Sequence, residues 1–134
     1  KALQSLAEEL GVSGRIRYLG WRDDVAALLA ASDVLVCPSR IEPLGNVVIE
    51  AWAHGCPVVA AASSGPAWLV EDGVSGLLTA PEDANALAAA VRRVLSDTEL
   101  AARLAEAGRD AYRARFSEPA VVERYIELFE KVAR

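Results

Sequence analysis

Short apolar strands that alternate with helical patterns restrict this chain to one class of fold. The segments 33–37 and 57–62 are almost wholly apolar, and a helical pattern over 45–54 lies between them. Strands that are apolar on both faces belong to parallel sheets, because helices cover both sides of such a sheet. A helix between two parallel strands makes a right-handed crossover. The sequence therefore predicts an α/β fold, with a parallel sheet flanked by helices.

The other patterns divide the chain into an alternating part, residues 1–80, and a helical part, residues 83–134. Hydrophobic spacing and turn residues predict these further elements in the first part: a helix over 2–10 ended by Gly11, a strand over 15–19, a helix from Asp23 or Asp24 to Ala31, a short helix over 66–70 and a strand over 76–79. The second part is expected to hold helices at about 84–95, 98–114 and 118–132, with Asp83, Asp97 and Ser117 as N-caps.

The composition excludes several classes of protein. Hydrophobic residues make up 53% of the chain, so a core can form. The net charge is −5 with no basic block, which argues against a nucleic-acid surface and against contact with an anionic membrane. The sequence has neither a long apolar run nor a signal-peptide pattern. Cys37 and Cys56 are expected to be buried free thiols, as in a reducing compartment, so we expect a cytoplasmic protein.

Two glutamates flank the start of the helix expected over 45–54. Glu42 lies in a Pro/Gly turn after the strand 33–37, and Glu50 follows eight positions later among apolar residues. Open α/β sheets bind ligands at the carboxyl ends of their strands. Free N–H groups at a helix start can hold a phosphate, and carboxylates accept hydrogen bonds from the hydroxyls of a sugar or ribose. A solvated surface charge explains Glu50 poorly, because its sequence neighbours are apolar.

A structural explanation carries about equal weight on spacing alone. In that case Glu42 caps the helix, and Glu50 is a buried carboxylate bonded to backbone. His54 lies at the end of the same helix, where a cation interacts favourably with the helix dipole. Arg40 either faces a diphosphate or is an exposed turn residue, and the second interpretation is slightly favoured.

Six segments, taken in order, are more specific than any of them alone. They are Leu19-Gly20-Trp21, Asp33 to Ser39, Glu42-Pro43-Leu44-Gly45, Glu50-Ala51, Gly55 to Ala60, and Glu71 to Leu78. Together they resemble the E-x7-E signature of retaining GT-B glycosyltransferases of the group 1, or GT4, type. The resemblance covers essentially the whole chain. It implies a Rossmann-like sheet in the C-terminal, donor-binding domain of an enzyme that transfers a hexosyl group from a UDP- or GDP-hexose to a hydroxyl acceptor.

The resemblance also implies roles for individual residues. Glu42 would contact the hydroxyls of the donor sugar and is the candidate catalytic residue. Glu50 would bind the ribose hydroxyls. The other expected donor contacts are Ser39, Leu44, Gly45, Asn46 and Val47 around the turn, and Gly20 and Trp21 near the base. Such enzymes use no metal, so we expect neither a metal nor a cofactor beside the nucleotide-sugar substrate.

The chain departs from the family pattern in two ways. Trp68 stands where a glutamate is common, so no catalytic role is assigned to the turn 64–68. In addition, the family's first two strand–helix units, with an Arg and a Lys for the diphosphate, and its N-terminal acceptor domain precede the segment matched here. A chain that begins at Lys1 in a helical pattern is therefore expected to be a piece of a longer protein.

Several expectations follow from this partial match. The strand 15–19 would lose its neighbours, and would pair with 33–37, swap with another copy or sit loosely. The apolar face of the last helix would be exposed, which favours association into a homo-oligomer or poor solubility. The isolated chain would transfer no sugar. The alternative to a glycosyltransferase part is a non-catalytic α/β binding or assembly module on the same scaffold.

Overall fold

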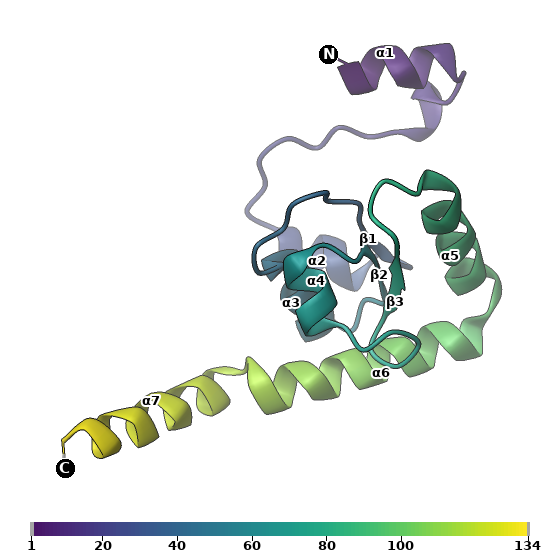
Figure 1. Ribbon diagram of the computed structural model, residues 1–134. Coiled ribbons are helices and arrows are strands. Elements are labelled where there is room, and N and C mark those ends of the chain that lie inside the picture. Colours follow the sequence, from purple (N-terminus) through teal and green to yellow (C-terminus); the bar gives the residue numbers. More distant parts are fainter. Residues whose placement is uncertain (1, 134) are drawn as a thin grey trace.

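A three-stranded parallel sheet forms the centre of the computed structural model, which describes residues 2–133 (Figure 1). The strands β1 (Leu35–Cys37), β2 (Val58–Ala61) and β3 (Leu77–Thr79) lie in the order β1-β2-β3. The register pairs Val36 with Val59 and Val59 with Leu77. The predicted α/β fold with a parallel sheet is thus confirmed.

The α-helices lie close to the predicted bounds, and one short 3-10 helix is added to them. They are α1 (Ala2–Glu9), the 3-10 helix η1 (Ser13–Arg15), α2 (Val25–Ala30), α3 (Asn46–Ala53), α4 (Ser64–Leu69), α5 (Ala84–Ser96), α6 (Thr98–Arg115) and α7 (Glu118–Val132). Gly55 ends α3 with a φ of +68°, a backbone conformation that glycine adopts at low cost.

The central strand β2 supplies side chains to two cores, one on each face of the sheet. Val58 and Ala60 belong to a core shared with α3 and α4, whereas Val59 belongs to a core shared with α5 and α6. This alternation follows from the two-residue period of a strand. All four β2 residues are buried, which explains why the strand is apolar at every position.

Trp52 connects α3 to α6 and to the loop before β3. Its side chain is fully buried, and its indole Nε1–H donates a hydrogen bond to the Ser75 carbonyl at 2.9 Å. A Cβ on Gly108 of α6 would collide with the indole ring. Glycine at this position therefore allows α6 to approach α3 closely, and the pair positions α3 against the sheet.

Two of the predicted N-caps are confirmed. The Asp83 carboxylate accepts a hydrogen bond from the Ala86 N–H at 2.8 Å, at the start of α5. The Asp97 carboxylate accepts one from the Leu100 N–H at 2.9 Å, at the start of α6. Each bond satisfies an N–H group that has no partner within its helix.

In α2 and α7 the predicted residues, Asp24 and Ser117, occupy the N-cap position, but neither side chain forms the capping hydrogen bond. Asp24 is the N-cap residue of α2, but its carboxylate binds the guanidinium of Arg22, with Nε and Oδ1 2.6 Å apart. Ser117 precedes α7, but its hydroxyl donates a hydrogen bond to the Arg113 carbonyl at 2.7 Å. A local partner takes the side chain in both cases, and residue type alone does not predict that competition.

The strand predicted over 15–19 is also wrong. η1 covers its first residue, and the rest of the segment has neither helix nor strand structure. Ile16 and Tyr18 instead line an apolar hollow with α1, and the Tyr18 hydroxyl donates to the Leu3 carbonyl at 3.3 Å. Figure 1 shows α1 apart from the sheet, joined to it by this segment. A strand needs a hydrogen-bonded neighbour, and an alternating sequence does not provide one.

The last helix, α7, extends away from the sheet beyond the end of α6 (Figure 1). Its apolar residues are exposed, as the sequence predicted: Val121, Val122, Tyr125, Ile126, Leu128, Phe129 and Val132. Association through this face stays a prediction. Within residues 2–133, no helix combines the length and the apolarity needed to cross a bilayer.

Candidate functional site

The turn between β1 and α3 holds Glu42 by its backbone and by its side chain. The Glu42 carboxylate oxygen Oε1 accepts a hydrogen bond from the Gly45 N–H at 3.2 Å. The Glu42 carbonyl accepts a second one from the Gly65 N–H at 2.7 Å. The other carboxylate oxygen, Oε2, has no partner among residues 2–133, so this half-buried side chain can still accept a hydrogen bond from a ligand.

Gly45 has no side chain that could cap the first N–H groups of α3. It is the N-cap residue, with φ 85° and ψ 46°, a left-handed conformation that glycine adopts readily. A Cβ at this position would lie 3.1 Å from Cδ1 of Leu69. The N–H groups of Asn46 and Val47 form no hydrogen bond with any residue of the described chain. Two free amides at a helix N-terminus can bind a phosphate or another anion.

Glu50 lies on the exposed face of α3, so the prediction that it is not a solvated charge is wrong. Asn46 and Glu50 are four residues apart and both exposed, whereas Val48 and Trp52 are fully buried. The apolar neighbours of Glu50 lie on other faces, because a helix turns once in about 3.6 residues. Within residues 2–133, no group bonds to the Glu50 carboxylate. A buried glutamate bonded to backbone is therefore excluded.

The structure gathers most of the expected donor residues in one place. Ser39 is half-buried, and its hydroxyl oxygen lies 3.7 Å from the Cys37 sulfur, which donates a weak hydrogen bond to it. The Leu44 side chain is 45% exposed beside the turn. Seven of the expected donor residues lie in the stretch that runs from the carboxyl end of β1 through the first two turns of α3. They are Ser39, Glu42, Leu44, Gly45, Asn46, Val47 and Glu50.

Gly20 and Trp21 are not bonded to this turn. Trp21 is 99% exposed, and Gly20 has a φ of +64°. Across residues 2–133, no hydrogen bond or ring contact joins either residue to the segment 38–45. Beside them, the Arg22 guanidinium lowers the pKa of the Asp24 carboxyl from its usual range, chiefly through their hydrogen bond. A role for Gly20 and Trp21 near the base stays a prediction.

Sequence reasoning missed the close contact between this turn and the start of α4. A Cβ on Gly65 would collide with the carbonyl group of Leu44. Ser63, which is 5% exposed, has a buried hydroxyl oxygen without a partner in the described chain. The signal in the sequence was the run of small residues after β2, which allows two backbone segments to approach each other.

The cysteines and the acidic residues form no evident metal centre. Among residues 2–133, no group of three His, Cys, Asp or Glu side chains could hold a metal ion. Cys37 and Cys56 are free and buried, as the sequence predicted. Burial, with a smaller contribution from the charge of Asp33, raises the pKa of the Cys56 thiol.

Comparison with known proteins identifies the family. The family model "Glycosyl transferases group 1" matches residues 1–111, and the chain belongs to this family. The chain is 46% identical over 126 residues to the lipopolysaccharide core biosynthesis glycosyltransferase LpsE of Rhizobium meliloti (strain 1021), covering 94% of this chain and 37% of LpsE. It is 39% identical over 129 residues to LpsD of the same organism, covering 96% of this chain and 38% of LpsD. The chain thus spans little more than a third of these curated relatives.

Solved structures share the fold over nearly the whole chain. Anabaena HepE in complex with UDP matches with a TM-score of 0.92 at 34% identity, over 97% of this chain and 36% of HepE. The complex of HepE with UDP-glucose matches with a TM-score of 0.88 at 32% identity, over the same shares of the two chains. These similarities confirm the resemblance to GT-B glycosyltransferases.

Proposed function

We propose that this chain is the nucleotide-sugar-binding part of a retaining glycosyltransferase that transfers a hexosyl group from a UDP- or GDP-hexose to a hydroxyl acceptor. One observation carries the proposal. The start of α3 presents free amides at Asn46 and Val47, and the exposed carboxylate of Glu50 lies one turn further along the helix. Membership of the group 1 family supports it, as do the complexes of HepE with UDP and UDP-glucose.

A nucleotide laid along α3 meets groups of the right chemistry in order. The amides at the helix start accept the phosphate charge. Glu50 follows Asn46 by four residues, about 6 Å along the helix axis, and its two oxygens accept hydrogen bonds from the vicinal ribose hydroxyls. The base then lies towards Gly20 and Trp21. Within this chain, the phosphate and ribose contacts use only residues at the start of α3 and one turn further along it.

The sugar lies on the Glu42 side of the helix start in this proposal. Oε2 of Glu42 accepts a hydrogen bond from a sugar hydroxyl, while Oε1 stays bonded to Gly45. Transfer of the sugar develops positive charge on the ring and negative charge on the leaving diphosphate. A fixed carboxylate and fixed amides are oriented to stabilise these charges without a metal ion.

The rest of the enzyme belongs to the proposal as well. The curated relatives are much longer than the chain, and we assign the acceptor domain and the two basic diphosphate ligands to segments preceding the matched one. The isolated 134 residues are accordingly expected to bind the donor weakly and to transfer no sugar. A cytoplasmic location fits the nucleotide-sugar substrate.

Calorimetric titration tests the proposal and separates it from a non-catalytic scaffold. UDP, UDP-glucose, GDP and GDP-mannose are titrated into the chain and into Glu50→Gln. A charge-assisted hydrogen bond contributes about 1.5–3 kcal/mol, so the variant should bind at least about tenfold more weakly. Glu106→Gln, at an exposed position of α6, is the matched control. Equal affinity in all three proteins would reject the donor site.

A further inference from the structure

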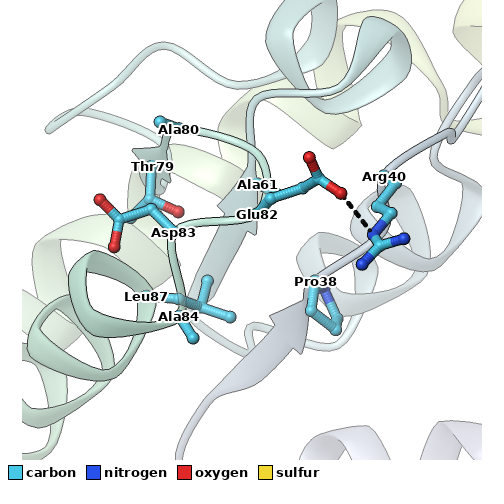
Figure 2. Close-up of a pocket in the computed structure, with 9 residues that line it drawn as sticks. All are labelled: Pro38, Arg40, Ala61, Thr79, Ala80, Glu82, Asp83, Ala84 and Leu87. Carbon is cyan, nitrogen blue, oxygen red and sulfur yellow. Dashed lines mark ion pairs between the residues drawn. The ribbon is translucent and has the colours of Figure 1, made fainter.

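A second hollow opens at the same edge of the sheet as the Glu42 turn, and none of the expected donor residues lines it. It lies at the carboxyl ends of all three strands, beside the start of α5 (Figure 2). Its volume is about 250 Å³, just below the range of about 300–1,000 Å³ typical of small-molecule pockets. We name it the β3 pocket. A hollow of this size can admit a single sugar ring.

A charged pair stands at one side of the β3 pocket. Arg40 and Glu82 point toward each other in Figure 2, with Nε of Arg40 2.8 Å from Oε1 of Glu82. Their side chains are 77% and 63% exposed. An ion pair so exposed contributes little to stability, so both groups remain available to a ligand.

The backbone at Glu82 carries strain. Glu82 has a φ of +65°, and among residues 2–133 no other residue apart from glycine has a positive φ. This left-handed conformation is costly for a residue with a side chain, and such strain concentrates at functional sites. Here the conformation belongs to the residue that pairs with Arg40 at one side of the pocket.

Thr79 adds a polar group at the other side of the β3 pocket. Its hydroxyl oxygen Oγ1 is buried and has no hydrogen-bond partner in the described chain. A buried hydroxyl without a partner is costly. Asp83 also lines the pocket, and its carboxylate accepts a hydrogen bond from the Ala86 N–H. The Ala84 N–H, which follows it at the start of α5, forms no bond with any described residue.

The chemistry of the pocket fits a neutral ring with several hydroxyls. The carboxylates of Glu82 and Asp83 disfavour an anion. Because Arg40 offsets the charge of Glu82, only the capping carboxylate of Asp83 is left to attract a cation. Hydroxyls can both donate to the carboxylates and accept from the guanidinium, from Thr79 and from a free amide. Pro38, Ala61 and Leu87 supply apolar walls for the C–H face of a sugar ring.

We propose that the β3 pocket binds a sugar ring of the acceptor, so that this domain contributes to acceptor recognition as well as to donor binding. The inference rests on the proposed function, because it requires a saccharide acceptor. It also follows from connectivity. Arg40 precedes Glu42 by two residues in the turn after β1, so the turn supplies one side chain to each of two neighbouring sites.

Amide shifts in the 15N-labelled chain test this inference. The probes are the methyl α-glycosides of D-glucose, D-galactose, D-mannose and N-acetyl-D-glucosamine at high millimolar concentration. At least one should shift the amides of residues 79–87 and the Arg40 Nε–H signal. Thr79→Val should weaken binding about fivefold, as expected for the loss of one neutral hydrogen bond. Thr98→Val, at the exposed start of α6, should bind like the parent.

The variants also distinguish a binding role from a structural one. Thr79→Val removes a buried hydroxyl without a partner, so its melting temperature should equal or exceed that of the parent. Glu82→Asn keeps a residue that tolerates the left-handed conformation, so it should fold normally and yet bind the glycoside more weakly. Absence of shifts at 79–87 with every glycoside, or equal binding by Thr79→Val and the parent, overturns the inference.

A parallel titration with UDP keeps the two proposals apart. If UDP shifts residues 44–50 and no glycoside shifts 79–87, the acceptor pocket fails and the donor site stands. If a glycoside shifts 79–87 and UDP shifts nothing at 44–50, the β3 pocket binds carbohydrate and the donor proposal fails.

Discussion

The Gly65 N–H donates a hydrogen bond to the Glu42 carbonyl at 2.7 Å. This bond joins the start of α4 to the turn that carries the candidate catalytic carboxylate. The two segments follow different strands, β1 and β2, and meet at the carboxyl edge of the sheet. Glu42 is thus positioned from both sides, through Gly65 at its carbonyl and through Gly45 at its side chain.

Gly65→Ala should disrupt this arrangement. The added Cβ would collide with the Leu44 carbonyl, which is backbone and cannot rotate away. We expect a loss of about 1–3 kcal/mol in the free energy of unfolding, as for other overpacked sites. Urea unfolding followed by circular dichroism measures it. Gly14→Ala is the matched control, because a Cβ there meets nothing within 4 Å, and a parent-like stability for Gly65→Ala would refute the steric argument.

Trp52→Phe should destabilise the chain through an unpaired carbonyl. The indole N–H is the hydrogen-bond donor to Ser75, which is 5% exposed. Leaving that carbonyl unpaired costs about 1–3 kcal/mol, and the smaller ring leaves a cavity that adds to the loss. Trp21→Phe, at a side chain 99% exposed, should stay within about 0.5 kcal/mol of the parent. Equal urea midpoints for the two variants would contradict the assigned role of Trp52.

Cys56 should react slowly with thiol reagents in the folded protein. Burial raises the pKa of its thiol, so at mildly alkaline pH the reactive thiolate is a smaller fraction than in a free cysteine. The rate of maleimide labelling should rise when pH increases towards the raised pKa, and should rise sharply in urea. The variant Cys37→Ser isolates Cys56 for this measurement. Labelling as fast as that of a free cysteine in native buffer would show that the thiol is accessible.

The exposed face of α7 should drive association of the isolated chain. Phe129 is 64% exposed and stacks with Tyr125, their ring centroids 6.2 Å apart. Sedimentation velocity over a range of concentrations should show reversible self-association, weakened in Phe129→Lys. Glu127→Gln changes the net charge by the same amount without removing apolar area, and should associate like the parent. A parent chain that stays monomeric at every concentration would contradict the prediction.

The sequence predicted the elements whose structure depends on local pattern and on burial. β2 is buried at every position, so its continuous apolar run identified it, and α5 and α6 were located through their aspartate caps. Charged and apolar residues alternate in the segment 15–19 as they do in a half-buried strand, but a strand also requires a hydrogen-bonded neighbour. Pairing is a property of the whole fold, and no local pattern in this segment carries that information.

The sequence predicted the turn and the helix on which the candidate site residues lie, but it did not predict how exposed they are. Glu50 was expected to be shielded, because its neighbours in sequence are apolar. In the structure the same neighbours lie on the buried and half-buried sides of α3, and Glu50 is exposed. Arg40 and Glu82 form an ion pair although they are more than forty positions apart in the sequence. Glu82 has a left-handed backbone conformation at this contact. Nothing in the sequence around either residue indicates that contact.

Mapping nucleotide binding by NMR tests the proposed donor site at the start of α3 most directly. UDP, UDP-glucose and GDP are titrated at millimolar concentration into the 15N-labelled chain and into Glu50→Gln. We predict amide shifts concentrated at residues 44–50, strongest for Asn46 and Val47, and clearly reduced in the variant. No shift at these residues with any nucleotide, or equal shifts in the parent and in Glu50→Gln, would contradict a nucleotide site on α3.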